Sequence, residues 1–205
     1  MKAKVCGISK IEHLKTCINN GADFCGFILN YPKSHRYISF EKAQELTNIK
    51  KNKTNFVGVL VNPSHEEIDK FSKLNLDYFQ IYGDYNDKKI LEIKSKYMKK
   101  IIVALQIKNK SDVLNYKKVE KSADIILWDS SGLEQSVGWE YDWIKSISGN
   151  FTKMIAGNLD IDKLEIISKL ADIVDVSGAL ETNKVKDINK IKKFLEKVKK
   201  INDEN

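Results

Sequence analysis

The chain has 205 residues, of which 42% are hydrophobic and 31% are charged, and its formal net charge is +7. This length and composition predict one domain with a substantial core, and no apolar run approaches the roughly 18 residues that span a bilayer. The lysines are spread along the chain without an aromatic-interleaved basic patch, so we expect no nucleic-acid partner and no membrane partner. A modest positive field would instead attract a phosphorylated small molecule.

The N-terminus leads directly into a strand-like run without the long apolar region of a signal peptide, so we expect a cytoplasmic protein. The three cysteines, Cys6, Cys17 and Cys25, are odd in number and have no Cys-x-x-Cys spacing. The pattern therefore indicates neither a disulfide framework nor a zinc site. For Cys17 and Cys25, which fall within a helix-like and a strand-like segment, we expect a structural role.

Short apolar runs typical of strands alternate with longer segments of helical period along the whole chain. The expected strands are 2–6, 23–29, 55–61, 78–82, 100–105, 124–128, 152–156 and 173–177. The expected helices lie near 10–20, 40–49, 65–74, 87–97, 111–121, 142–148, 160–170 and 187–200. Such alternation predicts a parallel sheet, because each crossover between parallel strands needs a long connection. Eight units ending in a helix predict an α/β protein with a single (β/α)8 barrel over residues 1–205.

An aspartate opens every second predicted strand. These residues are Asp23, Asp77, Asp124 and Asp172, and they are 54, 47 and 48 residues apart. The spacing corresponds to two strand–helix units, which favours a closed barrel over an open sheet. Aspartate is also common in turns, so the repeat carries modest weight by itself.

In such barrels the active site lies at the C-terminal ends of the strands, where Cys6 and Asp129 fall. Cys6 would be a base or nucleophile as a thiolate, which requires a cationic or dipolar neighbour. Its position alone favours a small buried apolar side chain instead. Asp129 follows four apolar residues, and a low-dielectric boundary raises a carboxyl pKa as a general acid requires. A capping or loop aspartate is the alternative.

Other polar residues fall at the same predicted rim. Arg36 follows the second strand, Gln80 and Tyr82 end the fourth, and Asp175 lies within the eighth, where we expect its side chain to point into the barrel. The loops after the last two strands contain small residues whose backbone N–H groups could bind a phosphate. The predicted phosphate-binding residues are Gly157, Asn158, Ser177, Gly178 and Ala179.

The motifs in this order resemble those of the phosphoribosylanthranilate isomerases, enzymes of tryptophan biosynthesis. The likeness runs in register through Lys4-Val-Cys-Gly-Ile, Pro32-Lys-Ser-His-Arg-Tyr, Tyr78-Phe-Gln-Ile-Tyr-Gly, Ile126-Leu-Trp-Asp and Val174-Asp-Val-Ser. The resemblance implies an Amadori rearrangement of N-(5-phosphoribosyl)anthranilate to 1-(2-carboxyphenylamino)-1-deoxyribulose 5-phosphate, with no cofactor and no metal. It also implies that Cys6 is the general base, Asp129 the general acid and Arg36 the ligand of the anthranilate carboxylate, with Gln80, Tyr82 and Asp175 in substrate binding.

The chain departs from the family pattern mainly at the implied phosphate end. Family members usually have histidine where Tyr82 stands and a second glycine where Asn158 stands. The glycine-rich stretch before Asp142-Trp143 is reduced to residues 135–138, and the Ser-Ser-Gly after the eighth strand becomes Ser177-Gly178-Ala179. Because any non-proline residue supplies a backbone N–H, and asparagine tolerates left-handed φ, we expect the phosphate site to be kept, with altered geometry and weaker affinity.

Three alternatives remain open from the sequence. One is another phosphosugar isomerase of the histidine/tryptophan barrel group, although the histidine-pathway enzymes use paired aspartates and the first strand here ends in Cys6. Another is a degenerate, non-catalytic phosphate-binding barrel, which the changes at the phosphate end favour. The third, a nucleic-acid-binding protein, rests on the charge alone. The sequence is compatible with a monomer or a homodimer.

Overall fold

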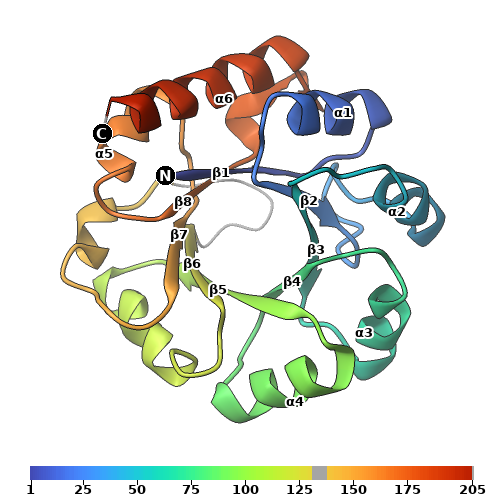
Figure 1. The fold of residues 1–205 in the computed structure, drawn as a ribbon. Helices are drawn as coiled ribbons and strands as arrows, with labels where there is room; N and C mark the ends of the chain where they lie inside the picture. The colour runs from blue at the N-terminus through green and yellow to red at the C-terminus, as the bar shows by residue number, and fades with distance from the viewer. Residues whose placement is uncertain (131–137, 205) are drawn as a thin grey trace.

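A computed structural model of the protein describes residues 1–130 and 138–204. Eight parallel strands form an inner ring that closes into a barrel, with helices around it (Figure 1). The strands are β1 Lys2–Cys6, β2 Phe24–Ile28, β3 Asn55–Val61, β4 Tyr78–Tyr82, β5 Lys100–Ile107, β6 Ile125–Ser130, β7 Thr152–Ile155 and β8 Ile173–Val176. The ring closes where β8 pairs with β1, with Lys4 opposite Asp175. The predicted (β/α)8 fold is confirmed.

The connecting helices are less regular than the sequence pattern predicts. The α-helices are α1 Ile11–Asn19, α2 Phe40–Thr47, α3 His65–Ser72, α4 Asp87–Tyr97, α5 Leu164–Ile167 and α6 Ile188–Asp203. The 3-10 segments are η1 Lys110–Lys118, η2 Tyr141–Ile144, η3 Ile161–Lys163 and η4 Gly178–Leu180. The helices expected near 111–121, 142–148 and 160–170 are therefore wrong in type or length. Those segments are rich in Ser, Asp, Asn and β-branched residues, which compete with or disfavour a regular helix.

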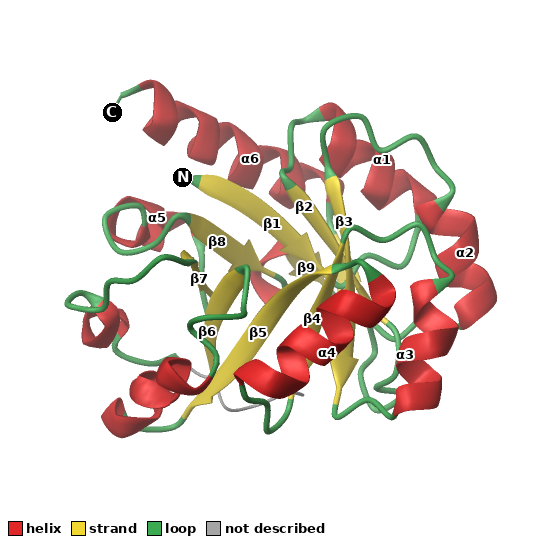
Figure 2. Ribbon diagram, turned by 60° about the horizontal axis from the view of Figure 1, so that its bottom comes forward, coloured by secondary structure: helices red, strands yellow, loops and turns green. Residues whose placement is uncertain are grey.

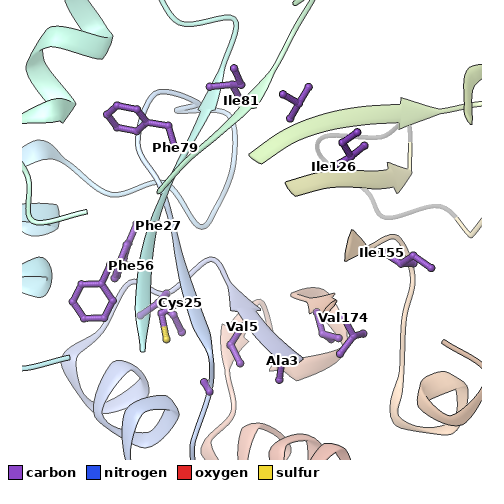
Figure 3. Packing of buried hydrophobic residues seen from close by; sticks show 14 of the residues in the cluster. Ala3, Val5, Cys25, Phe27, Phe56, Phe79, Ile81, Ile126, Ile155 and Val174 are labelled. Atoms are coloured by element: carbon purple, nitrogen blue, oxygen red, sulfur yellow. The ribbon is translucent and has the colours of Figure 1, made fainter. Parts of the chain in front are cut away.

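The barrel has two apolar cores because successive side chains of a strand point to opposite faces. Side chains of one parity, such as Val57 and Leu127, fill the interior of the barrel. Side chains of the other parity pack between the strands and the helices, where Phe27 and Phe56 meet edge to face at 5.4 Å (Figure 3). Figure 2 shows the same arrangement from the side, with the helices outside the inclined strands. Cys17 and Cys25 belong to the outer core, as expected for structural cysteines.

The four aspartates of the sequence repeat have one shared role at the N-terminal rim of the barrel. Each carboxylate accepts a hydrogen bond from a backbone N–H near the start of the preceding odd-numbered strand. The bonds run from Ala3 to Asp23 at 2.8 Å, from Phe56 to Asp77 at 2.7 Å, from Ile101 to Asp124 at 2.7 Å and from Lys153 to Asp172 at 2.8 Å. Charge-assisted bonds of this kind stabilise the rim more than neutral ones.

The C-terminal helix is tied to the first strand. The Asn202 side chain accepts a hydrogen bond from the Met1 ammonium at 2.6 Å and donates one to the Met1 carbonyl at 2.8 Å. α6 places Ile191, Phe194 and Leu195 in the outer core, so its amphipathic pattern is used for packing. Among the described helices, none has the length and apolar character needed to cross a membrane.

Candidate active site

A cavity of about 430 Å³ opens at the C-terminal ends of the strands. Ten of the eleven residues that the sequence places at the site line it: Cys6, Arg36, Tyr82, Asp129, Gly157, Asn158, Asp175, Ser177, Gly178 and Ala179. The remaining one, Gln80, is buried behind Tyr82, to whose hydroxyl its amide donates a hydrogen bond at 3.1 Å. The fold thus gathers residues from distant parts of the chain around one opening.

Cys6 lies beside a buried ion pair that links β1 and β8. Lys4 and Cys6 share the inward face of β1, and the Lys4 ammonium donates to Asp175 Oδ2 at 2.7 Å. Both Lys4 Nζ and Cys6 Sγ lie within 3.2 Å of the place where a Cβ on Gly26 would sit, so only glycine leaves them room to share that space. Asp175 points inward, as predicted for an in-strand aspartate. Its Oδ1 atom is buried without a hydrogen-bond partner among the described residues.

The two charges of this ion pair act on the Cys6 thiol in opposite directions, because Lys4 lowers its pKa whereas Asp175, like burial, raises it. Burial raises the pKa of Cys6, while the Lys4 charge and a hydrogen bond from Lys4 lower it. Burial alone would lower the pKa of Lys4, but the neighbouring Asp175 and Cys6 raise it, so Lys4 is a permanent cation. Burial also raises the pKa of Asp175, against the effect of Lys4. Lys4 therefore supplies the cationic neighbour that a reactive thiolate requires.

Asp129 lies inside β6 rather than after it, because the strand continues to Ser130. The carboxylate is therefore not a helix cap, and it faces the cavity. Tyr82 donates a hydrogen bond to Asp129 Oδ2 at 2.7 Å, and the Ser130 N–H donates to Oδ1 at 2.7 Å. Burial raises the pKa of Asp129 to about 6, although these hydrogen bonds lower it. Burial and the charge of Asp129 raise the pKa of Tyr82 well above its ordinary value, so Tyr82 remains a neutral donor.

Arg36 is held at the mouth by a second charge cluster. Its Nε and one terminal NH2 group donate to the two Glu181 oxygens at 2.6 and 2.9 Å. The Lys186 ammonium also donates to Glu181 and, at 3.2 Å, to the Ser177 carbonyl. Burial alone would raise the pKa of Glu181, but Arg36 and Lys186 lower it to about 2. Gly7, with φ +78°, leaves space for Arg36, since a Cβ there would lie 2.4 Å from Arg36 Cδ.

The loop after β7 has the backbone geometry that the sequence anticipated. Gly157 has φ +98° and Asn158 has φ +48°, so the asparagine adopts the left-handed region where the family usually has glycine. A Cβ on Gly157 would lie 3.0 Å from Ser130 and 3.1 Å from Trp139. In the loop after the neighbouring strand β8, the Ser177 hydroxyl donates to the Cys6 carbonyl at 3.0 Å. Residues 135–137, the rest of the altered glycine-rich stretch, lie outside the described residues.

Several residues that organise this site were not predicted from the sequence. Lys4 had a signal, because it stands two residues before Cys6 and strand alternation places both side chains on one face. No sequence pattern pointed to Glu181 or Lys186 as site residues. They belong to β9 Glu181–Thr182 and β10 Val185–Lys186, which form a two-stranded hairpin. Its turn residues Asn183 and Lys184 both have positive φ, as a type I′ turn requires.

The closed eight-stranded barrel, with buried ionisable side chains converging at its C-terminal rim, defines a (β/α)8-barrel enzyme. The family model of N-(5'-phosphoribosyl)anthranilate isomerase matches residues 3–197. This chain belongs to that family.

Similar proteins agree with this membership along nearly the whole chain. The chain is 36% identical over 204 residues to the N-(5'-phosphoribosyl)anthranilate isomerase of Streptococcus mutans, covering 97% of this chain and 99% of that relative. It superposes with a TM-score of 0.85 and 27% identity on a monomer generated from the dimeric isomerase of Thermotoga maritima, covering 98% and 99% of the two chains. A phosphoribosylanthranilate isomerase in complex with reduced 1-(o-carboxyphenylamino)-1-deoxyribulose 5-phosphate gives a TM-score of 0.82 at 28% identity, with the same coverage.

Proposed function

We propose that this chain catalyses the Amadori rearrangement of N-(5-phosphoribosyl)anthranilate in tryptophan biosynthesis, with Asp129 as general acid and Cys6 as general base. The observation that carries the proposal is that the half-buried Asp129 carboxyl and the buried Cys6 thiol line one cavity. Asp129 has a raised pKa that keeps a proton available. Cys6 has a permanent cation at its side. The reaction needs one proton donor and one proton acceptor, and this site offers one of each.

Asp129 starts the reaction by giving its proton to the ring oxygen of the furanose. The C1–O bond breaks, its electron pair stays on the oxygen, and the anthranilate nitrogen lone pair forms the C1=N bond of an iminium. With a pKa of about 6, Asp129 is protonated in roughly a tenth of molecules at pH 7. Tyr82 fixes the orientation of this carboxyl through its 2.7 Å hydrogen bond.

Cys6 then acts as thiolate on the acidified C2–H bond. The thiolate takes the proton, the C2–H electron pair forms a C1=C2 enolamine and the iminium nitrogen is neutralised. Tautomerisation returns a proton to C1 and leaves the C2 ketone of the product. Lys4 stabilises the thiolate during this step, because its ammonium is desolvated and cannot titrate at neutral pH. The substrate supplies the electron sink, so the proposed steps need no cofactor.

The cluster of Arg36, Glu181 and Lys186 binds the anthranilate carboxylate in this proposal. Two cations and one anion leave one net positive charge at the mouth, which matches one carboxylate. Glu181 already occupies the edge of Arg36 formed by Nε and one NH2 group. The substrate carboxylate is therefore bound by the remaining guanidinium N–H groups. The phosphate is placed against the loops after β7 and β8, at Gly157, Asn158, Ser177, Gly178 and Ala179.

A coupled assay tests the proposal directly. Purified protein is given phosphoribosylanthranilate made in situ, and the loss of substrate fluorescence is followed. We expect turnover by the wild type in the absence of added metal or cofactor, without inhibition by nucleic acid. No turnover would favour the degenerate phosphate-binding barrel, and turnover of only a histidine-pathway substrate would favour the other isomerase. We further propose that the protein acts in the cytoplasm, as a monomer or homodimer.

A further inference from the structure

Three consecutive carbonyl groups in the loop after β7 are each held by a side chain from outside the cavity. The Trp139 indole N–H donates to the Ala156 carbonyl at 2.9 Å. The Tyr141 hydroxyl donates to the Gly157 carbonyl at 2.6 Å. The Lys163 ammonium donates to the Asn158 carbonyl at 2.9 Å. The direction of each of these peptide groups is therefore set by a side chain.

Fixing a carbonyl also fixes the N–H of the next residue. A trans peptide is planar, so its N–H points opposite to its C=O. The anchored carbonyls therefore turn the N–H groups of Gly157 and Asn158 away from the two aromatic side chains, and the Leu159 N–H away from the Lys163 ammonium. None of these three N–H groups donates a backbone hydrogen bond to another residue in the described part of the chain.

The cavity lies on the side toward which these N–H groups turn. Gly157, Asn158 and Leu159 line it, whereas Trp139 and Tyr141 line a separate hollow beyond the loop. Trp139 and Tyr141 are themselves braced, with ring centroids 5.1 Å apart in an edge-to-face contact. Successive backbone N–H groups that converge on one space form an anion-binding concavity.

We propose that Trp139 and Tyr141 are positioning residues that aim the backbone N–H groups of the loop after β7 at the substrate phosphate. This inference rests on the proposed function and deepens it. It attributes the orientation of the phosphate-binding N–H groups to two side chains that do not themselves contact the phosphate. It also explains how the site tolerates Asn158 in place of glycine. Anchored carbonyls hold the left-handed backbone that the missing glycine would otherwise make easy.

The local charges are compatible with an anion. Burial, together with the nearby Asp160, raises the pKa of Tyr141 to about 12, so its hydroxyl remains a donor at neutral pH. Asp160 also lines the cavity and would repel a phosphate. The Lys163 ammonium lies 3.9 Å from the Asp160 carboxylate and reduces that repulsion.

The test compares Tyr141→Phe with a matched control, Tyr116→Phe. Both changes remove one phenolic hydroxyl, but Tyr116 packs in a remote aromatic cluster with Trp128 and Phe151. Binding of inorganic phosphate and of anthranilate is measured by calorimetry on the whole protein, together with KM, kcat and thermal unfolding. We expect Tyr141→Phe to weaken phosphate binding and raise KM by about three- to tenfold, the effect of losing one oriented hydrogen bond. Anthranilate binding and kcat should stay within about twofold of the wild type, and the control should change neither ligand.

Trp139→Phe provides a second variant that removes the other anchor. The inference would be overturned if the variants bound phosphate and anthranilate equally more weakly, or if phosphate binding were unchanged in both variants. A wild type that binds no phosphate would also overturn it. Selective loss of phosphate affinity without a change in thermal unfolding supports it. A wild type that binds phosphate but turns over no substrate would remove the proposed isomerase activity and leave this inference standing.

Discussion

The two rims of the barrel use aspartate for different purposes. At the N-terminal rim, Asp23 and its three counterparts accept backbone hydrogen bonds and remain in contact with solvent. At the C-terminal rim, Asp129 and Asp175 line the cavity, and burial raises the pKa of both. The same side chain is thus an acceptor of backbone hydrogen bonds at one rim and, in the case of Asp129, a proton-transfer candidate at the other, where its surroundings favour the protonated form. The surroundings of an aspartate therefore decide whether it stabilises this fold or takes part in proton transfer.

The largest expected effect follows from removing the proton-transfer groups at the C-terminal rim. Cys6→Ala and Asp129→Asn should each lower kcat/KM by about a thousandfold or more, since each removes a whole acid or base. Urea unfolding should show that both variants keep the wild-type stability to within about 1 kcal/mol. A variant that retained near-wild-type turnover would show that its role is wrongly assigned.

The buried ion pair between Lys4 and Asp175 should contribute both to stability and to activity. Lys4→Met leaves the Asp175 charge buried without its partner, so the free energy of unfolding should fall by about 3–5 kcal/mol. The double variant Lys4→Met/Asp175→Leu removes both charges and should recover most of that stability, but not the activity. Equal stability of the single and double variants, measured by urea denaturation, would argue against a buried ion pair.

The pH dependence of kcat/KM should reveal the order of the two pKa values. The pKa of Asp129 is about 6, and that of Cys6 is raised above its ordinary value, so it lies higher. Below pH 6 Asp129 stays protonated and rising pH only increases the thiolate, so kcat/KM rises. Above pH 6 the gain in thiolate is cancelled by loss of protonated Asp129, and a plateau follows until Cys6 titrates.

The variant Tyr82→Phe tests whether Asp129 sets the lower break point of the pH profile. The Tyr82 hydrogen bond lowers the pKa of Asp129, so its removal should raise that pKa and move the start of the plateau to higher pH. Tyr85→Phe is a suitable control, since that residue does not line the cavity. A profile whose lower break point stays in place would show that Asp129 does not govern it.

The smallest expected effect belongs to the N-terminal rim. Asp23→Ala leaves the Ala3 N–H without its acceptor and should lower the free energy of unfolding by about 1–2 kcal/mol. Turnover per folded molecule should not change, because the cavity is at the opposite end. Reduced kcat in a fully folded sample would mean that the two rims are coupled.

The parts of the molecule set by local periodicity could be predicted from sequence, and the parts set by packing could not. Alternation of apolar runs located all eight strands, and counting them brought Cys6 and Asp129 to one rim. The extension of β6 to Ser130 depends on pairing with β5, which no local pattern records. The role of Glu181 could not be predicted because its partner Arg36 is 145 residues away in the sequence. Tyr141 was hidden because its partner is a backbone carbonyl rather than a side chain.

The aspartate repeat has a consequence for how the chain could be rearranged. The barrel consists of four β-α-β quarters, each with two consecutive strands. Each carboxylate accepts a hydrogen bond from the first strand of its own quarter: Asp23 from β1, Asp77 from β3, Asp124 from β5 and Asp172 from β7. Circular permutants that open the chain between quarters, for example between β4 and β5, keep every carboxylate covalently close to its partner. Openings inside a quarter, such as between β3 and β4, separate one pair by almost the whole chain. The tolerated new termini should therefore alternate around the ring.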